Sequence, residues 1–563
     1  MTDLLIVGAG PTGLTAAAEA VRHGLSVRII DANQHSSIHS KALVIHSRTL
    51  EVFTDMGFVD TVLERGQEFR ALNIYADGKA LSRIDFRAIS WQDAIYPFWL
   101  SLPQSETERL LEEHLGRLGV QVERQTRLTA LAQEGDQVHA TLTHINDDGE
   151  TVSEEVISVP WLVGCDGARS ATRKLSGIPF EGTAEDELFI LGDVDLEWDQ
   201  PEDEGQNFMS ADGILLVVPL PEPKRYRIIA HMPALSVNQE PEITSSLLQS
   251  LLDQRTGMQS QVKEMTWSSS FSIKHLVAAK HRQGRVFLAG DAAHIHSPVG
   301  GQGLNTGIQD AYNLMWKLAL VHHGNGSEKL LDSYQTERHE VAEATIKKVS
   351  FATHVVTLKN PISRTLRNQL ASILVNTDAV RNRMGRDVGM LDISYTHSEV
   401  VKEDAIQLNR AQKMLQAVHN SEGHFENGPA SGERTPNVLY MDEKGKPHSL
   451  VDSLYGTQHT LLLFAGLSDK RPSETLSEIN SLIAQRYPAV RTVLVTTTAV
   501  GSTDWSGDTL VNKGGAIHRR FGATEEAVYL IRPDNHIGYR SQPVTVDLVQ
   551  AYLEQVFVPT VIS

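Results

Sequence analysis

The stretch from Gly284 to Asp310, GRVFLAGDAAHIHSPVGGQGLNTGIQD, combines residue types that suit the binding of a polar ligand. The apolar run at 286–289 predicts a buried strand, and Asp291 follows it where α/β sheets bind ligands. Glycines such as Gly303 let the backbone approach a flat or charged group. A helical pattern begins near Leu304, and the first N–H groups of a helix attract negative charge. The pattern predicts a site for a polyhydroxylated, partly anionic ligand, with an ordinary βα turn as the alternative.

The N-terminal residues carry a second pattern of this kind. An apolar strand at 4–7 runs into Gly8-Ala9-Gly10-Pro11-Thr12-Gly13, a helical segment follows, and Asp31 ends the next strand. The glycines allow a tight turn close to a pyrophosphate, the helix N-terminus stabilises phosphate charge, and the acid accepts hydrogen bonds from a ribose. Pro11 suits the first turn of a helix because its missing N–H costs nothing there. This combination is typical of a dinucleotide site.

Two further features suit the same ligand. Lys41 and Arg48 predict cations near a pyrophosphate, although each is equally well explained as a solvated surface charge. Residues 161–164 form another apolar strand, which ends at Cys165-Asp166-Gly167 and leads into ARSATR, the expected start of a helix. Asp166 is thus a third acid that directly follows a strand.

Composition narrows the function classes. The chain has 563 residues and a net charge of −19, which argues against nucleic-acid partners and anionic membrane surfaces. The single cysteine, Cys165, excludes an intrachain disulfide, a CxxC pair and a multi-cysteine zinc site. His294 and His296 lack an evident third ligand, so no metal is expected. Without a signal-peptide pattern or a long apolar run, the expected location is the cytoplasm. A homodimer is left open.

The order of elements predicts an α/β fold with three domains. Residues 1–180 and 276–400 form the expected discontinuous, Rossmann-like nucleotide-binding domain. Residues 181–275 are mostly strands and predict an inserted mixed or antiparallel β-sheet that binds the substrate. A helix and a polar linker are expected at 401–435, followed by a small α/β domain without cysteines at 436–563.

The three motifs stand together and in order: GAGPTG with Asp31, GCDGARSATR at 164–173, and GDAAHIHSPVGGQGLN at 290–305. They resemble the fingerprints of group A flavoprotein monooxygenases, the FAD-dependent aromatic hydroxylases of the para-hydroxybenzoate and phenol hydroxylase type. The resemblance covers residues 1 to about 400. The C-terminal part, with FGATEEAVYLIRPDNHIGYR at 521–540, resembles the thioredoxin-like domain of the polyketide hydroxylase branch. That domain carries no cysteine and cannot perform thiol redox chemistry.

The resemblance implies roles for the matching residues. Gly8, Gly10 and Gly13, with Pro11 and Thr12 between them, would hold the FAD pyrophosphate, and Asp31 would bind the adenosine ribose. Lys41 and Arg48 would supply positive charge, although lysine lacks the two-pronged fork of the arginine that many relatives carry at position 41. Gln104 would contact FAD, and Leu128 would lie beside the adenine.

The second and third motifs would complete the cofactor site. Asp166 would lie near the pyrophosphate and assist NAD(P)H, and Asp291 would bind the ribityl or pyrophosphate region. Gly303, Leu304 and Asn305 would lie at the isoalloxazine, with the backbone N–H groups of Leu304 and Asn305 facing its N1–C2=O edge. A helix N-terminus suits the negative charge of a reduced flavin.

The reaction that the resemblance implies uses FAD, O2, and NADPH or NADH as a transient co-substrate. A flavin C4a-hydroperoxide would hydroxylate a phenolic or polycyclic aromatic substrate in surroundings that exclude water. Strands in 187–275 would wall the site, with Phe208 and Trp267 as candidate substrate contacts and the carbonyl of Pro298 facing the substrate. The sequence identifies no catalytic base and does not distinguish between substrates or between the two nicotinamides.

Two alternatives remain open at this stage. A halogenase or reductase could share the FAD fold, although the WxWxIP signature of halogenases is absent from the chain. A flavoprotein that only binds an aromatic ligand could also carry the three motifs, with the C-terminal domain as an interaction module. Consumption of NAD(P)H distinguishes this last alternative from an enzyme.

Overall fold

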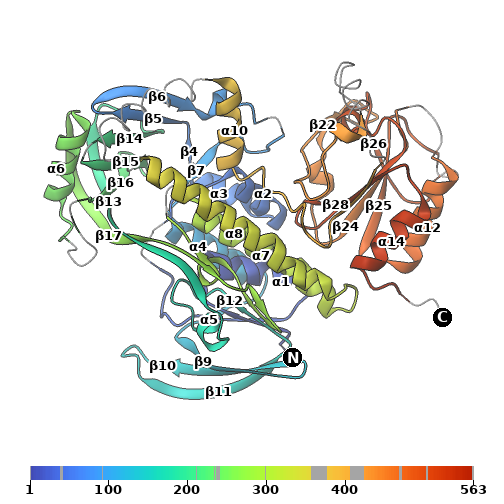
Figure 1. The fold of residues 1–563 in the computed structure, drawn as a ribbon, viewed down its shortest axis with the longest axis horizontal. Helices are drawn as coiled ribbons and strands as arrows, with labels where there is room; N and C mark the ends of the chain where they lie inside the picture. The colour runs from blue at the N-terminus through green and yellow to red at the C-terminus, as the bar shows by residue number, and fades with distance from the viewer. Residues whose placement is uncertain are drawn as a thin grey trace.

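The structure, a computed structural model, describes residues 2–37, 42–91, 93–210, 212–233, 235, 241–297, 300–356, 377–405, 424–467, 472–501 and 505–560. Figure 1 shows three regions: a central nucleotide-binding region, a large curved sheet at the upper left, and a C-terminal α/β domain at the right. Within the described ranges, no helix combines the length and apolar character that crossing a membrane requires.

The central region is built on a six-stranded sheet in the order β18-β19-β12-β1-β2-β8. All neighbours are parallel except β18 and β19. The strands span Leu4–Val7 (β1), Val27–Ile30 (β2), Val122–Glu123 (β8), Trp161–Gly164 (β12), Arg282–Gln283 (β18) and Val286–Leu288 (β19). The Rossmann-like prediction for this part of the chain agrees with the parallel sheet and its long crossovers.

Alternation along β1 explains why both faces of this sheet are covered. Leu4 and Ile6 point into a core shared with several helices, whereas Leu5 and Val7 point into a core shared with a three-stranded sheet. The longest of these helices are Pro11–Arg22 (α1), Gln104–Arg117 (α4), Gln302–His322 (α7) and Lys329–Val356 (α8); the covering strands are Thr126–Glu134 (β9), Gln137–Ile145 (β10) and Thr151–Val159 (β11). Helix α1 packs against both α4 and α7.

The second region is an eight-stranded sheet in the order β20-β17-β13-β16-β15-β14-β5-β6. Its strands span Ala71–Ala76 (β5), Lys79–Asp85 (β6), Phe180–Trp198 (β13), Glu204–Ser210 (β14), Gly213–Pro219 (β15), Arg225–His231 (β16), Ser260–Ala278 (β17) and His294–Ile295 (β20). Helix α6 (Ser245–Thr256) covers one face, away from the central region (Figure 1). The sheet exceeds the expected range 181–275 because β5 pairs in parallel with β14, a contact that no local pattern signals.

Short elements join these two regions. One of them is a small three-stranded sheet in the order β3-β7-β4, whose strands span Val44–Ile45 (β3), Trp99–Ser101 (β7) and Gln67–Phe69 (β4). The helices Ser47–Met56 (α2), Val59–Arg65 (α3), Ala171–Leu175 (α5) and Asp378–Val388 (α10) complete this part. Val218 on the eight-stranded sheet packs in one core with Leu43 and Trp99, so the face opposite α6 meets the central region.

The C-terminal domain has a six-stranded mixed sheet in the order β21-β28-β27-β24-β25-β26. Its strands are Lys402–Ala405 (β21), His459–Phe464 (β24), Val490–Thr496 (β25), Asp508–Val511 (β26), Ala527–Ile531 (β27) and Ile537–Gln542 (β28). Helices Glu474–Arg486 (α12), Ala516–Phe521 (α13) and Val546–Val556 (α14) flank it, and Leu439–Met441 (β22) and Pro447–Ser449 (β23) form a hairpin. The segment 401–435, expected to hold a helix and a linker, therefore contributes a sheet strand at its start, while 406–423 lie outside the described residues.

Candidate functional site

The three motifs meet at one edge of the central sheet. Val7 pairs with Gly164, and Gly164 pairs with Leu288, so the strands β1, β12 and β19 end side by side. The contact continues into the loops, because Cys165 donates its N–H to the carbonyl of Val7 at 2.7 Å and Ala289 donates to Gly164 at 3.0 Å. Carboxyl ends of parallel strands are the usual ligand edge of such sheets.

The glycines of the first motif serve two purposes. Gly8 has φ of +102°, and a Cβ there would lie 2.5 Å from the carbonyl oxygen of Cys165. A Cβ at Gly13 would lie 1.9 Å from the carbonyl oxygen of Gly8. At Gly10, by contrast, a Cβ would meet no atom within 4 Å. Gly8 and Gly13 thus permit the tight turn, whereas Gly10 faces open space that suits an approaching ligand.

Two long helices begin at this edge without a side-chain cap. Gly10 is the N-cap of α1 and Gly301 is the N-cap of α7, and neither helix has an acidic residue in its first turn. Thr244, Ser473 and Thr545 cap other helices with their side chains, whereas α2, α4 and α13 also begin without such a cap. Uncapped helix N-termini leave N–H groups and partial positive charge for a ligand. A diphosphate and a ring system with a negative edge fit these two positions.

Thr12 joins the first motif to the third. A Cβ at Gly290 would lie 2.5 Å from the Thr12 hydroxyl oxygen, and a Cβ at Gly307 would lie 2.3 Å from it. Only glycines at 290 and 307 therefore leave room for this side chain between α1, α7 and the turn after β19. The predicted cofactor residues Thr12 and Gly303 thus lie on elements that pack directly against each other.

The acids that follow the strands have identifiable roles in the loops. Asp31 is buried and accepts hydrogen bonds from the N–H groups of Ala9 at 2.7 Å and Asn33 at 2.8 Å. Asp166 accepts from the Thr172 N–H at 2.9 Å and from the Thr172 hydroxyl at 3.1 Å, which fixes the start of α5. Asp291 is exposed at the same edge. Asp31 and Asp166 thus order the loops of this edge, and the contacts of all three acids to a cofactor stay a prediction.

The next residues to place are the predicted cations Lys41 and Arg48 and the predicted ligand contacts Gln104 and Pro298. Arg48 is buried, and its guanidinium bonds to Glu51 at 2.9 Å and to the carbonyl of Asp534 in the C-terminal domain at 2.6 Å, while its contact to a pyrophosphate stays a prediction. Gln104 begins α4 and donates its backbone N–H to the carbonyl of Ala42 at 3.0 Å. Lys41 and Pro298 lie outside the described residues.

A clasp that the sequence did not indicate holds the start of α7. The Asn305 amide donates to the carbonyls of Val44 and Gly301, each at 2.8 Å, and accepts from the His46 N–H at 2.9 Å. The His46 ring donates to the carbonyl of Gly300 at 2.9 Å. Burial lowers the pKa of His46 to about 4, so this ring is neutral at pH 7. Leu304 packs against the helical core beside it.

The three apolar residues predicted near the ligand lie in different places. Phe208 is buried on the α6 side of the large sheet and stacks on Tyr75 with ring centroids 4.7 Å apart. Trp267 is on the opposite face of this sheet, in register with Asp193, Arg227 and Val218 on neighbouring strands. That face meets the central region. Phe208 therefore does not line the same face as Trp267. Leu128 is buried with Val7 and Ile30 beneath the ligand edge.

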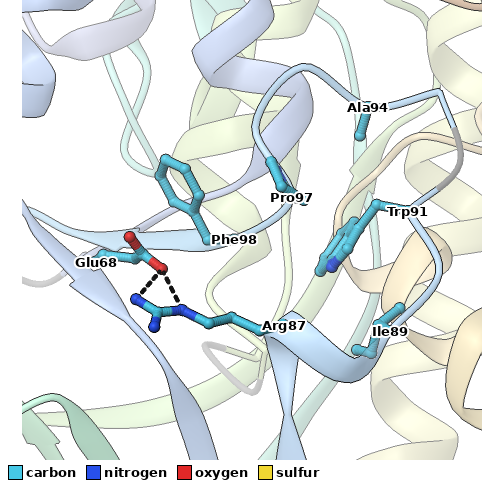
Figure 2. Close-up of a pocket in the computed structure, with 7 residues that line it drawn as sticks. All are labelled: Glu68, Arg87, Ile89, Trp91, Ala94, Pro97 and Phe98. Atoms are coloured by element: carbon cyan, nitrogen blue, oxygen red, sulfur yellow. Dashed lines mark hydrogen bonds and ion pairs between the residues drawn. The ribbon is translucent and has the colours of Figure 1, made fainter.

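A pocket of about 520 Å³ lies next to strand β7. Its lining residues are drawn in Figure 2. An Arg87–Glu68 ion pair closes one side, and the remaining lining residues are Ile89, Trp91, Ala94, Pro97 and Phe98. The neighbouring Trp99 packs edge-on against His46, with ring centroids 5.3 Å apart. None of the predicted cofactor residues lines this hollow, so we do not assign it to the cofactor.

Comparison with known proteins agrees with this geometry. The FAD binding domain family matches residues 1–349. The 6-methylpretetramide 4-monooxygenase of Streptomyces rimosus is 39% identical over 361 residues, which cover 64% of this chain but only 63% of that protein. The pentachlorophenol 4-monooxygenase of Sphingobium chlorophenolicum is 31% identical over 547 residues, which cover 96% of this chain and 93% of that protein. The anhydrotetracycline hydroxylase OxyS from Streptomyces rimosus has a TM-score of 0.71 at 26% identity, with 99% of each chain covered.

The class of the protein follows from the site and these likenesses together: it is an FAD-dependent aromatic hydroxylase, a flavoprotein monooxygenase. Because the match spans more than half of its length, the chain belongs to the FAD binding domain family. The turn at residues 8–13 leaves open space beside Gly10, and α1 and α7 both begin without a side-chain cap. On physical grounds, these features also fit FAD.

Proposed function

We propose that this protein uses NAD(P)H and O2 to hydroxylate a phenolic or polycyclic aromatic ring. The observation that carries the proposal is the meeting of three motif-bearing strand ends with two uncapped helix N-termini at one sheet edge. Relatives named for 6-methylpretetramide and pentachlorophenol support an aromatic substrate class.

Bound FAD would supply the electron transfer and oxygen activation that side chains cannot perform. The chain's own residues would bind, orient and shield it. Backbone N–H groups at the start of α1 would hold the pyrophosphate, with Asp31 and Asp166 ordering the loops around it and the exposed Asp291 available to the cofactor. The N-terminus of α7, held by the Asn305 clasp, would stabilise negative charge on the flavin ring.

Neutral histidines would keep this helix end free of competing charge. Burial lowers the pKa of both His46 and His296 to about 4. The His296 ring would lie 3.7 Å from a Cβ at Gly303, hence against the first turn of α7. With neutral rings on either side, the field at the flavin would come from the helix dipole rather than from a titrating cation.

The face of the large sheet that carries Trp267 would form the substrate wall. Arg227 on this face bonds through two nitrogens to Asp193 at 2.7 and 2.8 Å and lies 5.0 Å from the Trp267 ring centroid. A wall that combines the Trp267 ring with the Arg227–Asp193 ion pair would admit a flat apolar ring while excluding water.

The C-terminal domain would be thioredoxin-like in fold. Its order of elements, β24-α12-β25 followed by α13, β27, β28 and α14, with β24 parallel to β25 and antiparallel to β27, supports this. Since Cys165 is the only cysteine and lies at the sheet edge, the domain would have no redox role of its own.

The proposal is tested with purified protein reconstituted with FAD. Phenols and polycyclic aromatics are screened for stimulated oxidation of NADH and NADPH, and products are analysed by mass spectrometry. We expect at least one aromatic compound to stimulate nicotinamide oxidation and to gain one oxygen atom. Bound FAD that never oxidises either nicotinamide, whatever aromatic compound is added, would favour a ligand-binding flavoprotein instead.

A further inference from the structure

The turn between β27 and β28, residues Arg532 to His536, is buried although it is the tip of a hairpin. Arg532 is 3% exposed, Asp534 1% and His536 4%. Hairpin tips normally lie in water, and burying charged groups is costly unless each one is paired. We call this turn the plug, since it leaves the C-terminal domain and enters the nucleotide-binding region.

One side of α7 receives the plug. The Tyr312 hydroxyl lies 3.1 Å from the carbonyl of Pro533 and 2.7 Å from the Asp55 carboxylate, and the Asn313 amide donates to the Asp534 carboxylate at 3.0 Å. The guanidinium of Arg532 lies 5.1 Å from the Trp316 ring centroid. Tyr312, Asn313 and Trp316 lie on α7 at helical spacing, and the N-terminus of the same helix is the end that would face the flavin in the proposed function.

The two opposite charges of the plug, Arg532 and Asp534, pair with each other, and Arg532 also pairs with the nucleotide-binding region. Arg532 bonds to both carboxylate oxygens of Glu337 on α8, each at 2.8 Å. Lys317 on α7 bonds to the same carboxylate at 2.7 Å, and Arg48 on α2 bonds to the Asp534 carbonyl. Neighbouring cations hold the pKa of Glu337 well below its usual range despite burial, so the carboxylate is ionised. A buried network of this kind tolerates only one docked geometry.

A second set of contacts leads from the plug to the turn after β19. The His536 ring packs on Tyr395 with centroids 4.4 Å apart, and the Tyr395 hydroxyl accepts from Arg338 at 2.9 Å. Arg338 bonds to Asp310 at 2.6 Å, and Asp310 accepts the N–H of Gly290 at 3.0 Å. The plug therefore contacts elements that hold both the α7 end and the Gly290 end of the cofactor edge.

We propose that the C-terminal domain positions the FAD site, with Arg532 and Asp534 as positioning residues that set α7 through the plug. The domain is then neither a redox module nor a tethered partner-binding unit. Its contribution is to FAD affinity and flavin geometry, which are properties separate from the identity of the aromatic substrate.

The test compares two buried arginines of the same hairpin. Arg532→Lys keeps the charge but removes the two-pronged contact to Glu337. Arg540→Lys is the matched control, because Arg540 bonds within its own domain, to Glu403 at 2.8 Å and to the carbonyl of Phe425 at 2.9 Å. FAD affinity is measured by flavin fluorescence, ring geometry by visible circular dichroism, and stability by thermal unfolding. Tyr312→Phe is a milder second variant should Arg532→Lys not fold.

We expect Arg532→Lys to weaken FAD binding about tenfold, within the usual range for coupled sites, and to alter the visible circular dichroism. Tyr312→Phe should change both in the same direction by less, and Arg540→Lys should lower thermal stability with unchanged FAD affinity. Equal loss of affinity in both arginine variants, or unchanged affinity in Arg532→Lys and Tyr312→Phe, would overturn the proposal. Wild-type protein that bound no FAD would instead contradict the cofactor assignment, which keeps the two failures distinct.

Discussion

The backbone N–H of Gly290 donates a hydrogen bond of 3.0 Å to the buried carboxylate of Asp310, which ties the turn after β19 to helix α7. The same carboxylate bonds to His294 at 2.6 Å and to Arg338 at 2.6 Å. Neighbouring cations hold the pKa of Asp310 below its usual range although burial alone would raise it. Asp310 is therefore an ionised anchor directly beneath the cofactor edge.

Replacement of this anchor should be costly. Asp310→Asn leaves the buried guanidinium of Arg338 without its balancing charge, and breaking one partner of a buried pair costs about 3–5 kcal/mol. Urea unfolding monitored by fluorescence measures the loss. Asp332→Asn is the control: Asp332 pairs with Arg282 at 2.6 Å, but its side chain is 63% exposed, so about 0–1 kcal/mol is expected. Similar stabilities of the two variants would contradict the anchoring role.

A methyl group at Gly10 should separate cofactor binding from folding. A Cβ there meets no protein atom, so Gly10→Ala should fold with an unfolding midpoint close to that of the wild type. The methyl group would occupy the space beside the pyrophosphate, and FAD affinity should fall by about 1–3 kcal/mol, the cost typical of overpacking. Gly116→Ala in α4, where a Cβ also meets nothing, is the control and should retain FAD. Tight FAD binding by Gly10→Ala would refute the assignment of this turn.

Acidification should destabilise the protein through its buried histidines. Burial lowers the pKa of His281 and His459 to about 3, and of His46, His296 and His518 to about 4. Above about pH 6.5 these rings are neutral in both states. Between that pH and about 4, the unfolded chain binds protons that the folded chain does not, so the free energy of unfolding falls as pH falls.

The slope of this loss approaches about 1.4 kcal/mol per pH unit for each histidine. Urea unfolding at a series of pH values from 7.5 down to 4.5 measures it. His459→Gln should reduce the slope by about one proton equivalent, since the substituted side chain cannot titrate. A free energy of unfolding that stays constant across this range would show that the buried rings do not remain neutral.

The two aromatic residues on opposite faces of the large sheet should respond differently to truncation. Phe208→Ala removes a ring from the α6-side core and should cost about 3–5 kcal/mol of stability. Trp267→Ala, on the face that meets the central region, should instead raise KM for the aromatic substrate with FAD affinity retained. Steady-state kinetics and thermal unfolding of both variants separate these outcomes; a Trp267→Ala enzyme with wild-type KM would exclude Trp267 from the substrate wall.

The cofactor edge could be predicted because its signals are local. Gly8, Gly10 and Gly13 lie within six residues, and each acid directly follows its strand, so strand, turn and helix start are visible in one short window. The assignment of the protein to FAD-dependent aromatic hydroxylases rested on three such windows and is confirmed by the family match together with the monooxygenase relatives.

Long-range pairing could not be predicted in the same way. Arg48 and Asp534 are 486 positions apart, and a lone arginine in an amphipathic helix looks like a solvated charge. The strands β5 and β14 pair across more than a hundred residues, so residues 71–85 gave no sign that they belong to the large sheet. Asp310 and Arg338 lie within helices, where only the three-dimensional packing reveals that both are buried.

The most direct test of the account is to supply O2 carrying a heavy oxygen isotope to the FAD-reconstituted enzyme with NAD(P)H and an aromatic compound that stimulates nicotinamide oxidation. The account predicts a product that carries one labelled oxygen on the aromatic ring, with nicotinamide consumed in proportion. The contrary result would be that every stimulating compound speeds nicotinamide oxidation but all of the labelled oxygen appears in hydrogen peroxide and none in an aromatic product. That result would contradict aromatic hydroxylation as the function.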